Sequence, residues 1–467
     1  MLAVVLTLTA CATTRPTPPA PFEAPVAFKE DGLWKKAAPS APASSVPEAW
    51  WALFNDPVLD DLQRQLVIGN QNLQAAVAQV ASARAALQGS QSAQQPTLSV
   101  GAGASRTGNP ANAAGQRISA NSFSLTASAA WEVDLWGRLS QAVTVAGANL
   151  QASQDDLAAV RLSAQATLVQ TYLAMRAAEA QQALLERTVA ANQRSLDLTQ
   201  VRYTAGVAAQ SDVLQAQTQL KTVQVQLKET LVQRAQFEHA IAVLLGQPPS
   251  ALNLVRSAAL PELPAVPELL PSTLLERRPD IASAERKVAA AYAQIGVADA
   301  AFFPDLSLSA SAGYKGLSLG KLLSAPNLLW SLGPTLAAAV FDGGARRQAG
   351  DQARASADQA TATYRQTVLT ALQEVEDNLV VVDQLGAERL LQQDALKAAQ
   401  RNLEITQDQY KAGTVSYLNV VTAQTAALSS EANVLTLRNR QLAAANILLK
   451  NLGGRWQAEG SSLSATK

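Results

Sequence analysis

Apolar and small polar residues alternate along three short stretches of the chain. At 98–105 and 306–312 every second residue is Leu, Val or Ala, with Ser or Gly between them, and 122–129 repeats the pattern. A period of two predicts β-strands with one apolar and one polar face, which is typical of a barrel strand between lipid and water. A fourth, less regular strand is predicted near 329–341, where Pro334 interrupts the alternation. Two polar loops are expected to join the strands in pairs, at 107–121 and 313–327.

Long helices are predicted where proline is absent. Proline does not occur between Pro110 and Pro248 or after Pro334. Inside a helix it would cost about 3 kcal/mol, because it removes a hydrogen bond and clashes with the preceding turn. We predict continuous helices over 139–203 and 345–411. The first has 65 residues, which corresponds to about 97 Å at ~1.5 Å per residue.

These long helices are expected to fold back as helical hairpins. Apolar residues at 368–382 and 421–449 recur in steps of three, four or seven, which is the spacing of a coiled-coil seam. Each long helix ends in the sequence Tyr-x-Ala-Gly, whose last residue is Gly206 or Gly413. A glycine can adopt the left-handed conformation that ends a helix, so the chain can turn back on itself there.

The predicted elements occur twice, which indicates an internal repeat. A shorter helix is predicted before each strand pair, at 70–92 and 280–302. Matching residues 208 apart are Pro96 and Pro304, Asp134 and Asp342, and Arg138 and Arg346; those 207 apart are Tyr203 and Tyr410, and Gln217 and Gln424. One deletion therefore separates two copies of the same unit.

The repeat and the proline positions predict the domain organisation. The expected segments are a signal peptide (1–10), an amino-terminal arm with an equatorial segment (11–69), a first repeat (70–247), a Pro-rich linker (248–279), a second repeat (280–452) and a carboxy-terminal tail (453–467).

Composition excludes several function classes. Lys+Arg and Asp+Glu both total 37, so no basic excess is available to neutralise the phosphates of a nucleic acid. The single histidine, His239, lies in a predicted helix, where it is interpreted as a structural residue. Gly101-x-Gly103 is a fragment of a dinucleotide loop, but Arg106 occupies the third glycine position. No catalysis, metal or cofactor is expected, beyond a covalent lipid.

The only cysteine, Cys11, follows the short apolar stretch 1–10 and the residues Leu8-Thr9-Ala10. This arrangement resembles the end of a bacterial lipoprotein signal, in which the cysteine becomes the first residue and is acylated. It departs from a signal peptide in having no Lys or Arg before the apolar stretch. Ala12 follows, not the Asp that retains lipoproteins in the inner membrane, so sorting to the outer membrane is expected.

Four strands are too few to close a membrane barrel, since about eight is the usual lower limit. Open strand edges are excluded in lipid because unpaired backbone groups cost several kcal/mol each. The strands are therefore expected to be completed by other copies, three chains giving a roughly 12-stranded barrel that long helices extend. The predicted fold class is mainly α with membrane β-strands: two tandem repeats with helical hairpins that form a coiled-coil α-barrel.

With these elements in order, the chain resembles the TolC family of outer membrane factors, in the lipoprotein branch (NodT/OprM-like) that serves RND-type efflux systems. The resemblance covers nearly the whole chain. It rests on Trp50-Trp51, Asp56-Pro57, the run from Trp131 to Arg138, the run from Arg277 to Ile281, Phe302-Phe303-Pro304, the run from Phe341 to Gly344, and both Tyr-x-Ala-Gly turns.

The resemblance implies an outer-membrane exit channel of a tripartite efflux pump, which exports drugs, toxic compounds or metals from a Gram-negative bacterium. The implied partners are two further copies in a homotrimer, outer-membrane lipid, a periplasmic adaptor at the hairpin tips, and an inner-membrane RND-type pump that supplies the energy. An exit duct of a type I protein secretion system uses the same fold and is the alternative. A periplasmic coiled-coil scaffold would explain the helices but neither the strands nor the lipid signal.

The resemblance also implies a gate near the tips, formed by inward acidic residues and a tyrosine-anchored hydrogen-bond network. The residues that match the gate and the turns are Tyr203, Gly206, Asp212, Tyr410 and Gly413. In the second copy Asn419 and Thr422 stand where the family has acids, so weak cation selectivity is expected. Two other interpretations stay open: Ser211 or Asp212 as the N-cap of the return helix, and the tyrosines as packing residues.

Overall fold

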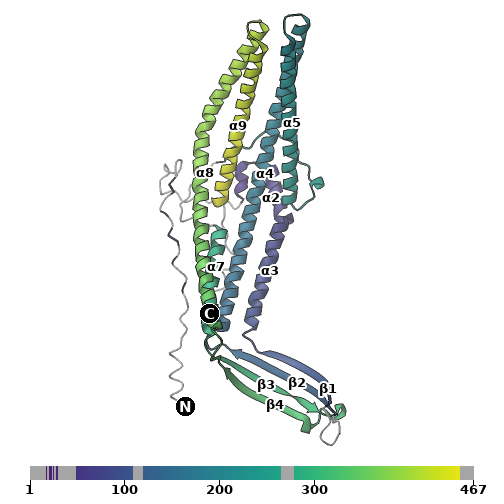
Figure 1. The fold of residues 1–467 in the computed structure, drawn as a ribbon, viewed down its shortest axis with the longest axis vertical. Helices are drawn as coiled ribbons and strands as arrows, with labels where there is room; N and C mark the ends of the chain where they lie inside the picture. Colours follow the sequence, from purple (N-terminus) through teal and green to yellow (C-terminus); the bar gives the residue numbers. More distant parts are fainter. Residues whose placement is uncertain are drawn as a thin grey trace. The chain divides into compact units, whose positions relative to one another are not determined.

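The computed structural model describes residues 49–108, 119–264 and 278–452, together with a few positions between 17 and 29. Two series of elements follow each other in the same order (Figure 1). The first is α3 (Gln71–Ser92), β1 (Thr97–Gly108), β2 (Ser119–Val133), α4 (Arg138–Thr204) and α5 (Gln210–Leu244). The second is α7 (Pro279–Ala300), β3 (Asp305–Gly316), β4 (Leu328–Ala337), α8 (Ala345–Lys411) and α9 (Tyr417–Leu452).

These bounds confirm the predicted internal repeat. Both ends of β3 lie 208 residues after those of β1, and both ends of α8 lie 207 residues after those of α4. The long helices agree with the prediction to within one residue at each end. In the predicted seams Val368, Val375, Leu442 and Leu449 are buried, so those positions do pack.

The predicted limits of the strands and loops were partly wrong. β1 and β2 extend to Gly108 and from Ser119, and β3 continues to Gly316, so the first residues of both predicted loops are strand. Gly313, the first residue of the second predicted loop, lies within the sheet opposite Thr126, where the backbone of β2 approaches it closely. A Cβ there would lie 2.3 Å from the carbonyl oxygen of Leu125. β4 ends at Ala337, earlier than predicted.

The four strands form one antiparallel sheet in the order β1-β2-β3-β4 (Figure 1). Its register pairs Thr97 with Ala130 and Asp305 with Ala337. The sheet edges are β1 and β4, and Pro334 lies in the edge strand β4, where a missing N–H is tolerated. Among the described residues, nothing pairs with the outer edge of either strand.

Contacts divide the chain into two units that cut across both repeats. One unit holds the sheet with Ala78–Asp155 and Ala282–Gln366, and its helices α7 and α8 pack through small side chains such as Ala298, Ala353 and Ala357. Small side chains let the two helix backbones approach closely.

The second unit holds both helical hairpins and the short helices η3 (Trp50–Phe54) and α2 (Pro57–Gly69). Helix α2 was not predicted, although its signal is in the sequence. Asp56 accepts hydrogen bonds from the backbone N–H groups of Val58 and Leu59, and Pro57 occupies the first turn. An N-cap followed by proline is a standard helix start.

Candidate channel face and hairpin tips

The two faces of the sheet differ in chemistry as predicted. Because directly paired residues share a face, the register places Leu98, Leu125 and Leu308 on one side. The opposite face carries mostly Ser, Gly and Thr. Its hydroxyl groups pair across strands: Ser99 Oγ lies 2.8 Å from Ser128 Oγ, and Ser311 Oγ lies 2.9 Å from Ser331 Oγ. Such a face suits water, whereas the apolar face suits lipid.

Both hairpins turn in the same way at their tips. Gly206 and Gly413 have φ angles of +75° and +78°. The N–H of Gly413 donates to the carbonyl of Tyr410 at 3.0 Å, and the N–H of Thr414 donates to the carbonyl of Gln409 at 3.0 Å. Gly206 and Val207 make the equivalent bonds. This pair of hydrogen bonds is the Schellman motif, and it confirms the predicted role of both glycines in ending the helices.

A contact between the two repeats lies beside these turns. The guanidinium of Arg202, on α4, lies 4.8 Å from the centroid of the Tyr410 ring, and its Nη1 donates to the carbonyl of Lys411 at 3.0 Å. The Tyr410 ring meets Tyr417 edge to face at 5.3 Å. The hydroxyl of Tyr417 lies 3.1 Å from Ser195 Oγ. The end of α4 is thereby joined to both helices of the second hairpin.

Burial distinguishes the two tyrosines of the repeat. Tyr410 is only 5% exposed, whereas Tyr203 is 42% exposed. Burial raises the pKa of Tyr417, so this tyrosine stays protonated and can donate. Sequence reasoning missed Arg202 and Tyr417, because neither belongs to the Tyr-x-Ala-Gly pattern. Within the single chain, Tyr410 is therefore a packing residue between helices, which is one of the two interpretations of the tyrosines, whereas Tyr203 is not.

The remaining predicted tip residues lie near the starts of the return helices. Asp212 is half-buried in the first turn of α5, and Asn419 and Thr422 are exposed on α9. The N-cap of α5 is Ala209, so the alternative that Ser211 or Asp212 caps this helix is wrong. The helix begins earlier because Gly206 completes its turn within a few residues. Asp212 still lies at the positive end of the helix dipole, where a carboxylate is stabilising.

A buried ion network crosses the first hairpin. Glu179 is fully buried and accepts hydrogen bonds from Arg176 at 2.7 Å, Arg234 at 3.1 Å and the backbone N–H of Ser257 at 3.0 Å. Burial lowers the pKa of Arg176, but the hydrogen bonds to Glu179 and Tyr172 outweigh it, so this pKa lies above its usual value.

The network holds the chain that follows α5, here called the strap (residues 252–261). Arg176 donates to the carbonyl of Val255, and Arg234 donates to that of Leu254. Farther along, Arg438 of α9 donates to the carbonyl of Pro261. The strap therefore contacts both hairpins. Apart from the prolines, no sequence pattern predicts the strap, because its partners are far apart along the chain.

The Arg-Pro-Asp motif at the start of α7 has a similar structural role. Arg278 is buried and contacts the carboxylates of Asp280 at 2.7 Å and Glu374 at 2.8 Å, as well as Asn451 Oδ1 at 2.8 Å. Burial raises the pKa of Asp280, but the hydrogen bond to Arg278 outweighs it, so the carboxylate stays ionised. The motif thus fastens the start of α7 to α8 and α9.

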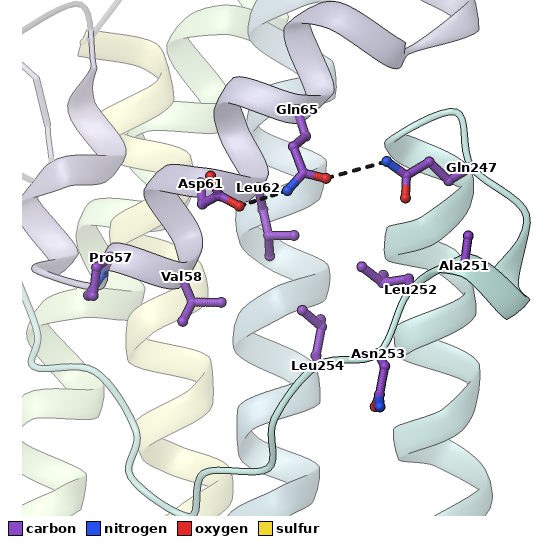
Figure 2. Close-up of a pocket in the computed structure, with 10 residues that line it drawn as sticks. All are labelled: Pro57, Val58, Asp61, Leu62, Gln65, Gln247, Ala251, Leu252, Asn253 and Leu254. Carbon is purple, nitrogen blue, oxygen red and sulfur yellow. Dashed lines mark hydrogen bonds between the residues drawn. The ribbon is translucent and has the colours of Figure 1, made fainter.

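An open pocket of about 480 Å³ lies between α2 and the strap. Figure 2 shows the residues that line it. Its floor is apolar, with Val58, Leu62 and Leu254, and its rim carries amides. Gln247 Nε2 donates to Gln65 Oε1 at 3.4 Å across the rim. Asp61 is the only charged side chain that lines it. Its carboxylate accepts hydrogen bonds from Gln65 Nε2 at 2.7 Å and Arg64 Nη2 at 2.9 Å, which hold the pKa of Asp61 below its usual value, so this carboxylate is suited to pairing and not to proton transfer.

Other candidate chemistry is limited. The described residues contain no group of three or more His, Cys, Asp or Glu side chains that could hold a metal ion. His239 is exposed on α5. Within the described ranges, no helix combines the length and apolar character needed to cross a membrane. Cys11, the signal peptide and the carboxy-terminal tail lie outside the described residues.

Comparisons with known proteins agree with this architecture. The model of the outer membrane efflux protein family matches residues 62–247 and 270–454. The chain is 33% identical to the pyoverdine export outer membrane protein OpmQ of Pseudomonas aeruginosa, over 99% of this chain and 98% of that protein. It is 30% identical to the probable efflux pump outer membrane protein TtgC of Pseudomonas putida, over 93% and 91%. The solved outer-membrane channel OprN has a TM-score of 0.84 at 29% identity, over 95% and 99%.

Proposed function

Because this chain belongs to the outer membrane efflux protein family, we propose that three copies of it form the exit channel of a tripartite efflux pump. The chain is an outer-membrane efflux component of a Gram-negative bacterium, and its family is one of channels, not of enzymes. The observation that carries the trimer is the four-stranded sheet with two unpaired edges. Lipid does not tolerate such edges, and twelve strands from three chains would remove them.

The repeat predicts how neighbouring copies pair. In the sheet order, β1 and β4 run antiparallel to each other, so β4 of one copy can pair antiparallel with β1 of the next. The register relates β1 to β3 by 208 residues, and β2 to β4 by 207, since Ala130 and Ala337 occupy equivalent places. Applying these shifts to the β2–β3 pair Phe123–Gly316 places Trp330 opposite Gly108 of the next copy. This register makes the apolar face of one copy continuous with the apolar face of the next, as a closed barrel requires.

Paired cysteines test this closure. Ser331→Cys with Thr107→Cys is expected to give disulfide-linked dimers and trimers, because the derived register places these two residues directly opposite each other across the copies, with Cβ atoms about 5 Å apart. Non-reducing electrophoresis of outer membranes measures the product. Ser331→Cys with Ser99→Cys is the mismatched control. A monomer only, or equal cross-linking in the control, would reject the proposed barrel.

The transported compounds are proposed to be small organic molecules. The names of the relatives support this, since one describes the export of pyoverdine and the other an efflux pump. A periplasmic adaptor at the hairpin tips would connect the channel to an inner-membrane RND-type pump. The outer membrane factor itself would supply the path and the gate.

The tip contact is proposed to hold the channel end closed. Arg202 joins the two hairpins within one chain through Tyr410 and Lys411. The same repeat shift would place Tyr203 against Gln409 of the next copy, with Asp212 and Asn419 beside the opening. The contact through Arg202 would then be the strongest of these joints, because glutamine offers no cation to an aromatic ring.

Arg202→Gln is expected to loosen this joint and raise the open fraction about tenfold, since a partly buried cation–π contact contributes roughly 1–2 kcal/mol. Single-channel conductance in planar bilayers checks the open fraction. Arg194→Gln, at an exposed position on the same helix, is the matched control. Equal open fractions in the two variants would remove Arg202 from the gate.

Acylation of Cys11 is proposed to anchor the amino-terminal arm in the outer membrane. The support is the position of the only cysteine directly after a short apolar stretch. Incorporation of a labelled fatty acid tests the anchor, and label retained in Cys11→Ser would reject it.

A further inference from the structure

Away from the ends of the strands that adjoin the helices, the strand region of this neutral chain carries only positive charge. Residues 97–131 and 306–341 contain no Asp or Glu. Their charged residues are Arg106, Arg117, Lys315 and Lys321. The chain as a whole has equal numbers of basic and acidic residues, so the excess is local to the two strand pairs and their connections.

The register assigns two of these charges to opposite faces of the sheet. Lys315 pairs with Ser124, so it belongs to the hydroxyl-rich face. Arg106 pairs with Asn121 on the apolar face and contacts Ser119 Oγ at 3.4 Å near the end of the strand. A long basic side chain at that place can reach the lipid headgroups.

The other charges on the polar face lie at the opposite end of the strands. Glu132 and Asp305 stand beside the helices, and Arg138 forms ion pairs with both. Glu132 pairs with Ser307, eight positions before Lys315 on β3, which corresponds to about 27 Å of strand. Among the described strand residues of the polar face, Lys315 is the only cation, and it is separated from both acids.

We propose that Lys315 makes the outward mouth of the channel lumen favour anionic solutes. The inference rests on the proposed function, because it needs the polar face to enclose the lumen and three copies to place three ammonium groups around it. The ammonium groups attract carboxylates, sulfonates and phosphates and repel cations of similar size. Their field extends about 10 Å at 0.1 M salt and about 30 Å at 0.01 M, so the preference is strongest at low ionic strength.

A thiol placed opposite Lys315 reports this field directly. Ser124→Cys is labelled in outer membranes at low salt with an anionic sulfonate and a cationic trimethylammonium methanethiosulfonate reagent, and the ratio of the two rates is measured. Any effect of the lysine on the thiolate fraction cancels in this ratio. The parent chain supplies the background from Cys11. The anionic reagent is expected to gain severalfold to about tenfold relative to Lys315→Gln, as two unit charges about 5 Å apart interact in water.

Matched variants decide the outcome. Lys315→Glu is expected to invert the ratio, and Arg106→Gln, which removes an equal charge from the apolar face, is expected to leave it unchanged. An unchanged ratio in Lys315→Gln, or an equal change in Arg106→Gln, would overturn the proposal. If neither reagent labels the introduced thiol, the polar face does not line water, and the proposed channel fails together with this inference.

Discussion

Glu179→Gln is expected to lower the stability of the first hairpin by about 3–5 kcal/mol. Glu179 is fully buried, and its carboxylate is shared by Arg176 and Arg234. Glutamine has nearly the same shape, but it removes the negative charge and leaves the buried guanidinium of Arg176 without its carboxylate, whereas the partly buried Arg234 keeps its ion pair with Glu238. An uncompensated buried charge is the costly result of breaking such a pair.

Hydrogen exchange gives a local readout of this loss. The N–H of Ser257 donates to Glu179, so a peptide that covers residues 252–261 is expected to exchange at least 100-fold faster in the variant. Glu186→Gln is the matched control, because Glu186 lies on the same helix and pairs with Arg256 at the surface. Surface pairs contribute about 0–1 kcal/mol. Similar exchange in the two variants would show that the buried network is not what holds the strap.

The regular elements could be predicted from the sequence because each depends on neighbours along the chain. The alternation at 98–105 fixes which face of β1 is apolar, and the proline-free segment 139–203 predicts α4 almost to its ends. The internal repeat then predicts the second half from the first. The turn at Gly413 followed from glycine chemistry alone, because few other residues adopt its φ of +78°.

The side-chain contacts could not be predicted in the same way. Arg202 meets Tyr410 across 208 positions, and Glu179 meets Ser257 across 78. No local pattern marks either pair. The repeat was also misleading here, since Tyr203 and Tyr410 occupy equivalent places but differ in burial. A single chain contains only the contact from the first hairpin to the second, through Arg202 and Tyr410. The contact from the second hairpin to the first, which would involve Tyr203, would require a neighbouring copy.

Gly413→Pro is expected to abolish efflux while leaving the barrel assembled. Proline fixes φ near −65°, whereas Gly413 has a φ of +78°, so the turn cannot form in its present geometry. Proline also removes the N–H that donates to the carbonyl of Tyr410. The helix would end elsewhere, and the tip that is proposed to meet the adaptor would be displaced. Gly206→Pro is expected to act in the same way on the first hairpin.

Susceptibility of cells to a compound that becomes toxic when the gene is deleted measures this loss, and the heat-resistant trimer in outer membranes reports the barrel. Gly413→Ala is the matched control, because its Cβ would meet only Arg202 Nη2, at 3.8 Å. Its positive φ costs about 1–2 kcal/mol, so partial efflux is expected. Full efflux by Gly413→Pro, with the trimer present, would show that the hairpin tips are not the docking surface. Loss of the trimer itself would instead show that the turn is needed for assembly, because the tip would then act on the fold and not on the partner.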